Sequence, residues 1–510
     1  MTPAKQADQD KKDLAKGAGV NFIGFIVRLG SRLPFMVLVL ALYGNDLYAR
    51  LIYITTVVEI AAAFSALGFK RSLFKFLHDE EYNSRHSTEE VIVSALTLAF
   101  VISLMVTALV ILSAQGLAVI FNYPEMVAGL TALAPIIIVI TLLDVLLAGT
   151  RATRKMRYEV ISRSFVEPYM LLGAMLLFYF LGNGEMGLLQ AYATALVAAL
   201  LVALWGSIRI YSWENFRKAR PRFKLMSDLA KFSGPTAFHD LALLIFMRMD
   251  IFTVKFFFSE STLGIYNIAQ QITTTVEKIY QSFYPILAPV MAKNLVEGDY
   301  AVVEQRMIMV SRWILLIQCM IVVWSIFYAE GIISLIAHKD TDPGLIAMGG
   351  IVLFFLMVGE TINGGFGTAD LPIMYRKPLF NPVISVVMIF SYVATAFAFV
   401  QILDLGPEGV AMALCTTYLI MNLIRVALIR RLFGIKMLRL KLLRVIFASM
   451  GSAITFKVCL LYSPIDLMHG WGAALGVILL IIIYGLTQYA FGLTENDKSK
   501  LRAKLGRNKA

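Results

Sequence analysis

Long apolar runs constrain the fold of this chain more than any other feature. With 59% hydrophobic and 16% charged residues, the chain lies outside the usual composition of soluble proteins. Only helices and closed barrels satisfy their backbone hydrogen bonds in hydrocarbon, and runs of this length favour helices. The runs therefore predict an all-α polytopic membrane protein. We count fourteen spans, at roughly 17–41, 47–69, 91–114, 126–150, 159–182, 187–208, 232–257, 264–290, 309–329, 345–368, 378–402, 408–429, 442–461 and 471–491.

The distribution of basic residues predicts the orientation of the spans. Of 46 Lys and Arg residues, 38 are counted in the termini and the even-numbered connections, and six within spans. The odd-numbered loops hold only Arg50 and Lys339. The positive-inside rule then places both termini in the cytoplasm. The net charge of +12 is interpreted as this orientation signal, so we expect no nucleic-acid partner.

Two segments of the chain share one pattern. The stretch "YARLIYITTVVE" begins at Tyr48 and "YNIAQQITTTVE" at Tyr266, and six of their twelve positions are identical. Upstream, Arg32 corresponds to Arg248. A shift of six spans preserves orientation, so the repeat predicts two pseudo-symmetric six-helix lobes related by an axis along the membrane normal, followed by two C-terminal helices.

These patterns predict a domain order. The polar first sixteen residues have no apolar core or cleavage site, so we expect a cytoplasmic tail without a signal peptide. The expected parts are a tail at 1–16, an N-lobe at 17–210, a basic inter-lobe loop at 211–231, a C-lobe at 232–432, two further spans at 433–491 and a basic cytoplasmic tail at 492–510.

Charged residues inside the spans are the candidate functional residues. A charge at the bilayer centre is costly, so such residues face partners or water. Spacings of three and four place the polar residues of spans 1, 2 and 8 on one face of each helix. Span 7 contributes His239 and Asp240 in its inner half and Arg248 and Asp250 in its outer half. We expect them to line a water-filled cavity between the lobes. The candidates are Arg28, Arg32, Thr55, Glu59, His239, Asp240, Arg248, Asp250, Gln270, Thr273 and Glu277.

A structural interpretation of single residues remains open. Threonines in membrane helices often bond their own backbone, and Arg28 with Glu59 could form a static ion pair between two helices. Asp144 and Glu360 are intramembrane acids in spans without such polar stripes, and a functional and a structural role both stay open for them.

Motifs for catalysis or metal binding are absent from the sequence. The five histidines have no metal-ligand spacing, there is no phosphate-binding loop of the Walker type, and the three cysteines lie in apolar runs. The outer loops are short, which disfavours an acceptor-binding enzyme domain. We therefore expect a protein that is not an enzyme and uses no cofactor.

The segment around span 7 resembles a known family. "RMDIFTVKFFFSESTLGIYNIAQQI" is similar to the polysaccharide transporters of the multidrug/oligosaccharidyl-lipid/polysaccharide exporter superfamily, with Asp250, Gly264, Tyr266 and Ala269 at the shared positions. "NDLYARLIYITT" resembles the equivalent start of span 2. The resemblance implies an alternating-access flippase of the bacterial inner membrane. It would move an undecaprenyl-pyrophosphate-linked oligosaccharide for surface polysaccharide such as the O-antigen of lipopolysaccharide.

The resemblance also implies roles for individual residues. Arginines line the cavity of the lipid II flippase in this superfamily, and Arg28, Arg32 and Arg248 fit that arrangement, whereas span 2 carries Glu59 in place of an arginine. Arginine pairs bidentately with phosphate oxygens, which suits a pyrophosphate. Glu59 and Glu277 would bind a coupling H⁺ or Na⁺ or pair with the arginines. Membrane lipids and polysaccharide polymerase or assembly proteins are the expected partners.

Two other functions remain open at this stage. A cation-coupled multidrug exporter of the same superfamily would use the acids to bind a cationic drug, but it would have little use for three cavity arginines. A membrane-embedded glycan polymerase or ligase is disfavoured by the short outer loops.

Overall fold

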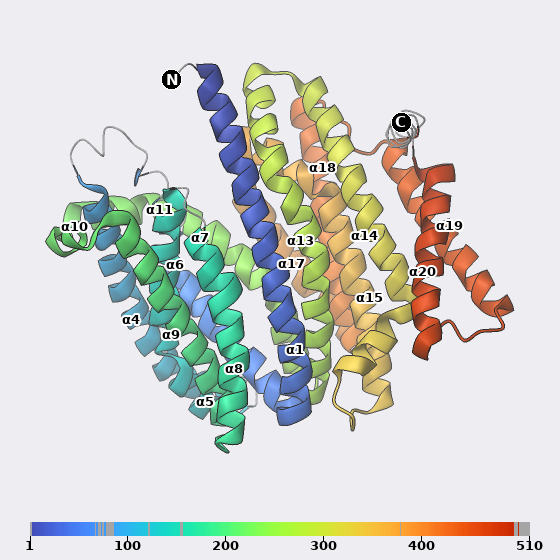
Figure 1. Ribbon diagram of the computed structural model, residues 1–510, viewed down its shortest axis with the longest axis horizontal. Helices are drawn as coiled ribbons and strands as arrows, with labels where there is room; N and C mark the ends of the chain where they lie inside the picture. The colour runs from blue at the N-terminus through green and yellow to red at the C-terminus, as the bar shows by residue number, and fades with distance from the viewer. Residues whose placement is uncertain are drawn as a thin grey trace, which may run out of the picture. The chain divides into compact units, whose positions relative to one another are not determined.

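The protein folds entirely into helices. The computed structural model describes residues 3–66, 68–69, 73, 76–77, 86–120, 123–153, 157–377, 379–493 and 498. All regular elements in these ranges are α-, π- or 3-10 helices (Figure 1). The all-helical fold class expected from the apolar runs is therefore confirmed.

Most of the long helices are apolar enough to cross a membrane. Among the described residues, ten helices satisfy this condition, and a bent pair makes an eleventh. The bent pair is α5 (Met126–Leu133) and α6 (Ile136–Ala152), which meet at an angle of 42°. Helix α1 (Pro3–Ser65) consists of two helices that meet at Gly44, where the backbone leaves the helical conformation with φ of 80° and ψ of 172°. This break lies between the predicted spans 1 and 2. The protein is thus a multi-pass membrane protein, and the finer count of fourteen spans remains a prediction.

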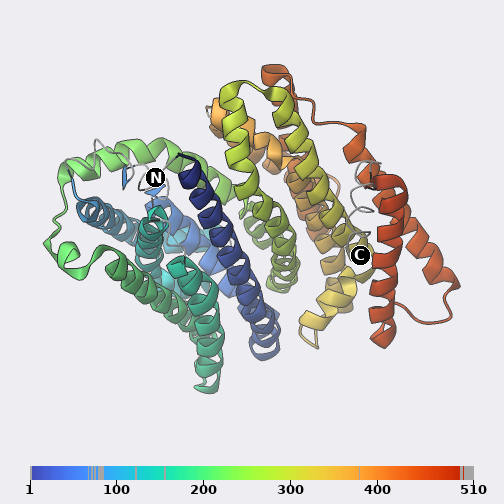
Figure 2. The same ribbon diagram turned by 45° about the horizontal axis from the view of Figure 1, so that its top comes forward.

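The chain divides into two compact units, and the first ends at Gly264. Its α8 (Glu167–Phe180) and α9 (Gly184–Tyr211) run alongside each other in Figures 1 and 2. The unit also contains, besides α1, α5 and α6, the elements α4 (Thr88–Ile120), α7 (Arg157–Glu159), η1 (Val160–Val166), α10 (Trp213–Lys218), α11 (Phe223–Phe246) and α12 (Met249–Phe257).

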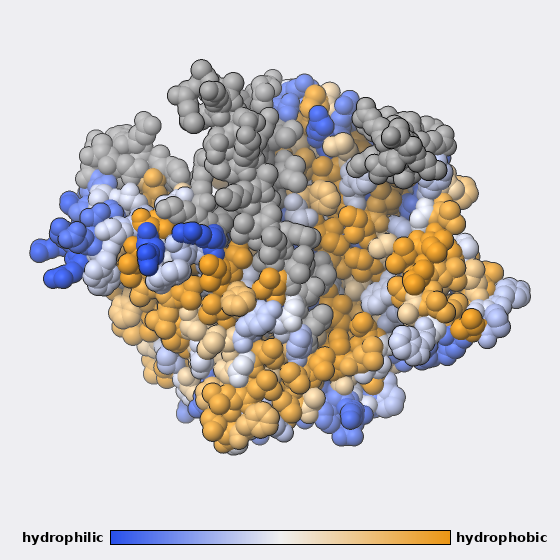
Figure 3. Space-filling model, in the orientation of Figure 1, coloured by the Kyte–Doolittle hydropathy of each residue, from blue (hydrophilic) through white to orange (hydrophobic). Residues whose placement is uncertain are grey.

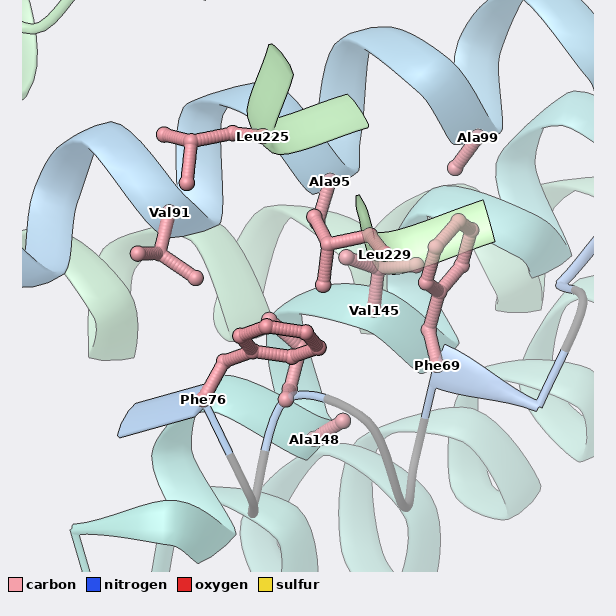
Figure 4. Packing of buried hydrophobic residues seen from close by; sticks show 10 residues of the cluster. Phe69, Phe76, Val91, Ala95, Ala99, Val145, Ala148, Leu225 and Leu229 are labelled. Carbon is pink, nitrogen blue, oxygen red and sulfur yellow. The ribbon is translucent and has the colours of Figure 1, made fainter. Parts of the chain in front are cut away.

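A cluster of buried apolar side chains holds part of this first unit together. Figure 4 shows Phe69 and Phe76, from the segment after α1, pointing toward the side chains of α4, α6 and α11. Small residues such as Ala95 and Ala148 allow the helices to approach closely, and Leu229 is fully buried between them. The cluster fixes α6 against α4, and α6 carries one of the site residues described below.

The second unit begins at Ile265, within α13 (Glu260–Glu297). Helices α14 (Tyr300–Ile336), α15 (Pro343–Phe366) and α18 (Gly406–Phe433) pack along one another (Figures 1 and 2). The final pair packs on α14 and consists of α19 (Leu440–Tyr462) and α20 (Gly470–Thr487). The remaining elements are η2 (Gly367–Ala369), α16 (Asp370–Arg376), α17 (Phe380–Phe397), η3 (Ala398–Ile402) and η4 (Gln488–Gly492).

Large apolar side chains cover the outward faces of many helices. Leu112 on α4 and Phe180 on α8 are about four-fifths exposed, at 82% and 80%. Figure 3 shows apolar surface over the middle of the helices, whereas hydrophilic side chains gather around α10. Extended apolar surface of this kind is unfavourable in water and typical of helices in lipid.

Arg50 ties together several loops at one end of the first unit. Its guanidinium bonds Glu260 at 2.9 Å and Glu185 at 3.1 Å, and it also pairs with Glu125. Lys255 bonds the other oxygen of Glu260 at 3.1 Å. One of the two basic residues predicted for the odd-numbered loops therefore has a structural role, because it links α1 to the starts of α5, α9 and α13.

Gly264 allows the first turn of α13 to approach α1 beside this Arg50 group. A Cβ at Gly264 would lie 2.9 Å from the backbone oxygen of Asn45, which cannot rotate away. We predict that Gly264→Val lowers the thermal midpoint of the purified protein markedly, because overpacking against backbone forces the helices apart. Gly331→Val is the matched control, since no atom lies within 4 Å of a Cβ there. Equal midpoints for the two variants would contradict this account of the packing.

Candidate functional site

The first unit contains a partly open cavity of about 630 Å³ with a densely charged lining. Its charged residues include four arginines and four acids, and Tyr192 lies among them. Charges within membrane-spanning helices are costly, so a cluster of eight is a strong candidate for a functional site. The charged lining residues are Arg28, Glu59, Asp144, Arg151, Glu159, Arg163, Glu167 and Arg248.

The carboxylate of Glu59 interacts with one arginine and one tyrosine. Nη2 of Arg248 donates to Oε2 of Glu59 at 2.7 Å, and the hydroxyl of Tyr192 donates to Oε1 at 3.1 Å. The chain turns at Met247 and Arg248, between α11 and α12, and this break in the helix presents Arg248 to α1. The repeat-based candidates Glu59 and Arg248 are thus partners in one site.

Arg163 connects two carboxylates on neighbouring helices. Its Nη2 donates to Asp144 of α6 at 2.6 Å, and its Nη1 donates to Glu167 of α8 at 2.9 Å. Arg163 lies on the π-helix η1, which leads into Pro168. Proline has no N–H to continue the α-helical hydrogen bonds, and π-turns inside α-helices often occur at functional sites. The local sequence therefore positions this guanidinium.

The remaining arginines near the cavity differ in their pairing. Arg151 bonds Glu159 at 3.3 Å. Arg28 lines the cavity, and none of the described acids forms an ion pair with it. Arg32, one turn further along α1, lies within electrostatic reach of Arg28, Arg248 and Glu59. The three arginines predicted from the sequence are thus grouped around Glu59.

Other candidates from the sequence lie elsewhere in the first unit. Thr55 is buried and its hydroxyl donates to the carbonyl of Leu51 at 2.8 Å, which is the structural alternative considered for threonine. Asp250 is 1% exposed, accepts the N–H of Ile251 and is not among the residues that line the cavity. The side chains of His239 and Asp240 lie outside the described residues.

Three candidates belong to the second unit. Thr273 donates to the carbonyl of Ala269 at 2.9 Å, and Gln270 accepts from Asn267 at 3.2 Å. Glu277 accepts a hydrogen bond from Gln281 and lies within electrostatic reach of Glu360. Their expected position in a cavity between two lobes remains a prediction.

Comparison with known proteins identifies the family. The family model described as polysaccharide biosynthesis protein matches residues 14–295, which is more than half of the 510-residue chain. The chain belongs to this family. No curated protein sequence matches the chain.

Solved structures with a similar fold come from one superfamily of transporters. The lipid II flippase MurJ in an inward closed conformation has a TM-score of 0.70 and 15% identity, covering 93% of this chain and 98% of that chain. An inward-facing multidrug resistance MATE family transporter of the MOP superfamily has a TM-score of 0.65 and 15% identity, covering 80% and 98%. MATE in complex with MaD3S has a TM-score of 0.57 and 16% identity, covering 83% and 96%.

The family match and the structural matches together show that this polysaccharide biosynthesis protein belongs to a family of transporters. Identities near 15% show the fold alone, which is that of the MOP superfamily transporters. Family and fold together identify a member of a transporter family and not an enzyme. The resemblance inferred from span 7 is confirmed at the level of the family.

Five of the eight charged lining residues were not predicted as site residues from the sequence. Arg163 was counted with a cytoplasmic loop, as were Arg312 and Arg425, yet all three lie inside helices. That part of the basic-residue count is wrong, because the predicted spans at 159–182, 309–329 and 408–429 already contain these three residues. For Asp144 the sequence favours neither a functional nor a structural role. The available signal was the i, i+4 spacing of Arg163 and Glu167 in an otherwise apolar run, which favours an intrahelical ion pair.

Removal of Arg163 is expected to destabilise the protein strongly. Arg163→Ala leaves Asp144 and Glu167 close together without their shared cation, and breaking such a partly buried group costs about 3 kcal/mol. We expect a clear fall in the thermal midpoint of the detergent-purified protein. The matched control is Arg217→Ala on the exposed face of α10. A midpoint for Arg163→Ala equal to that of the control would show that the ion-pair group contributes nothing to stability.

Proposed function

We propose that this protein is a flippase that moves an undecaprenyl-pyrophosphate-linked oligosaccharide across the bacterial cytoplasmic membrane by alternating access. The glycan would serve surface polysaccharide synthesis such as that of O-antigen and lipopolysaccharide. The observation that carries the proposal is the charged cavity, in which Arg248 pairs with Glu59 and Arg28 lines the same space. Membership of the polysaccharide biosynthesis family supports the same conclusion.

The arrangement of charges suits a pyrophosphate. None of the described acids engages Arg28, so its guanidinium is available to a phosphate. Arg248 is held by a single carboxylate of Glu59, which a doubly charged phosphate group can displace. Arg32 adds positive potential nearby. Such a site would attract the head group while the lipid chain stays in the bilayer.

Within this proposal the chain has fourteen spans, arranged as lobes at 17–210 and 232–432 with two further helices at 433–491. Two similar contacts support the repeat. A Cβ at Gly187 would meet Asn183 and Phe178, and a Cβ at Gly409 would meet Leu405 and Phe399. In each proposed lobe, the glycine thus allows the start of the last helix to pack closely against the residues that precede it. Both termini would be cytoplasmic, as the basic loops predict.

Two acids are proposed to couple transport to an ion gradient. Glu59 would release Arg248 to the pyrophosphate, and Glu277 would be its pseudo-equivalent in the other lobe. The coupling ion would be H⁺ or Na⁺, and no cofactor is required. The transported glycan, the membrane lipids and the enzymes that polymerise or assemble the polysaccharide would be the partners.

Deletion of the gene tests the proposed function. We expect the deletion strain to lose surface polysaccharide and to accumulate lipid-linked glycan in its membranes, and the wild-type gene should reverse both changes. A strain with unchanged glycan but raised sensitivity to cationic dyes would contradict the proposal and favour multidrug export.

A further inference from the structure

One wall of the cavity consists of charges that are already paired with one another. Asp144, Arg163 and Glu167 form one ion-pair group, and Arg151 with Glu159 forms another. We refer to these five residues as the paired wall. Arg28 lines the same cavity and, by contrast, has no ion pair with any described acid. The cavity therefore offers a ligand both an arginine without an ion pair and a group of charges that neutralise one another.

The paired wall is poorly suited to binding an ion. A cation would have to displace Arg163 from both of its carboxylates. A phosphate would meet the negative charges of Asp144 and Glu167. In the described part of the chain, no group of three or more His, Cys, Asp or Glu side chains could hold a metal ion. A neutral polar ligand fits this wall better than either ion.

The hydrogen-bonding groups of the paired wall match those of a sugar. Guanidinium groups only donate and carboxylates only accept, whereas each sugar hydroxyl does both. Such hydroxyls can bridge between Arg163 and its acids without leaving a charge uncompensated. We propose that the paired wall binds the sugar residue next to the pyrophosphate, and that Asp144, Arg163 and Glu167 are positions that determine glycan specificity. This inference rests on the proposed function.

The size and continuity of the cavity support this assignment. Its volume of about 630 Å³ lies within the range of roughly 300–1,000 Å³ that small-molecule sites occupy, and it exceeds what a pyrophosphate alone would need. Tyr192 donates to Glu59 and also lies within electrostatic reach of Glu167 and Arg163. The phenol therefore connects the arginine site with the paired wall, as a ligand with a phosphate followed by a sugar requires.

The experiment compares lipid probes with and without a sugar. The full-length protein in nanodiscs is titrated with undecaprenyl pyrophosphate and with a panel of undecaprenyl-pyrophosphate monosaccharides that carry glucose, galactose, N-acetylglucosamine or N-acetylgalactosamine. The variants are Asp144→Asn and Glu167→Gln, which keep shape and lose charge. Arg28→Ala tests the pyrophosphate site, and Glu214→Gln on the exposed face of α10 is the control.

We expect at least one sugar to tighten binding by about tenfold over the bare lipid, which corresponds to one charge-assisted hydrogen bond. Asp144→Asn and Glu167→Gln should remove this gain without weakening the binding of bare undecaprenyl pyrophosphate, because each removes a negative charge from the cavity. That retained affinity also shows that the variants are folded. Glu214→Gln should behave as the wild type.

Different outcomes contradict the sugar site and the proposed function. If no sugar improves binding, or if the gain persists in both acid variants, the sugar site is refuted while the flippase proposal stands. If either acid variant loses the bare lipid as well, the acids do not act on the sugar and the inference is again wrong. If the wild type binds none of the probes, the proposed function itself is contradicted.

Discussion

Replacing Arg28 with alanine is expected to abolish glycan export. Arg28 lines the cavity, and no acid among the described residues neutralises it, so it is the cation most available to the pyrophosphate. A bidentate, charge-assisted contact with phosphate contributes about 3 kcal/mol or more, so the loss should exceed a hundredfold. Arg32→Ala should act in the same direction, because Arg32 adds to the same positive potential.

The measurement is complementation of surface polysaccharide in the deletion strain, with expression checked by immunoblot. Arg28→Lys should restore part of the export, since the ammonium keeps the charge but lacks the planar fork. Arg217→Ala on α10 is the matched control and should restore export fully. Normal export by well-expressed Arg28→Ala and Arg32→Ala variants would refute the pyrophosphate site.

Replacing Glu59 with glutamine is expected to separate substrate binding from export. Glutamine keeps the shape and a hydrogen bond to Tyr192, but it no longer holds Arg248 by charge. The freed arginine should retain undecaprenyl pyrophosphate at least as tightly as the wild type. Export should fall by about tenfold or more and lose its dependence on the ion gradient, because no carboxylate displaces the phosphate when it must leave.

Binding of undecaprenyl pyrophosphate to the purified variant and export in the complemented strain test this expectation together. Glu214→Gln serves as the control for charge loss at an exposed site. A multidrug exporter makes the opposite prediction, since loss of Glu59 would then abolish binding of a cationic compound. Weakened binding of the pyrophosphate lipid by Glu59→Gln would contradict the proposed role of this acid.

Much of the fold could be predicted from the sequence because lipid imposes a simple rule. Apolar runs of sufficient length become helices, so the helical class followed from composition and periodicity. The exact spans were harder to place. The break at Gly44 falls between the predicted spans 1 and 2, whereas the chain breaks again at Met247 and Arg248, where neither glycine nor proline signals it.

Part of the candidate site could not be predicted from the sequence for a related reason. Glu59 and Arg248 stood out because they recur in the repeat and interrupt apolar faces, and they form one ion pair. Asp144 and Arg163 come from spans without long polar stripes, and their ion pair joins α6 to η1. A contact between distant helices leaves no periodic trace in either segment, so tertiary structure alone could reveal it.

The central claim is that the protein itself moves a lipid-linked glycan across a bilayer. Purified protein is reconstituted into liposomes with the lipid-linked glycan extracted from the deletion strain, and membrane-impermeant periodate then oxidises the glycans exposed on the outer leaflet. With wild-type protein, we predict that oxidation proceeds to nearly all of the glycan, because inner-leaflet molecules keep reaching the outside. Liposomes with Arg28→Ala should stop at the outer-leaflet fraction, as protein-free liposomes do. Wild-type liposomes that also stop at that fraction would contradict the account.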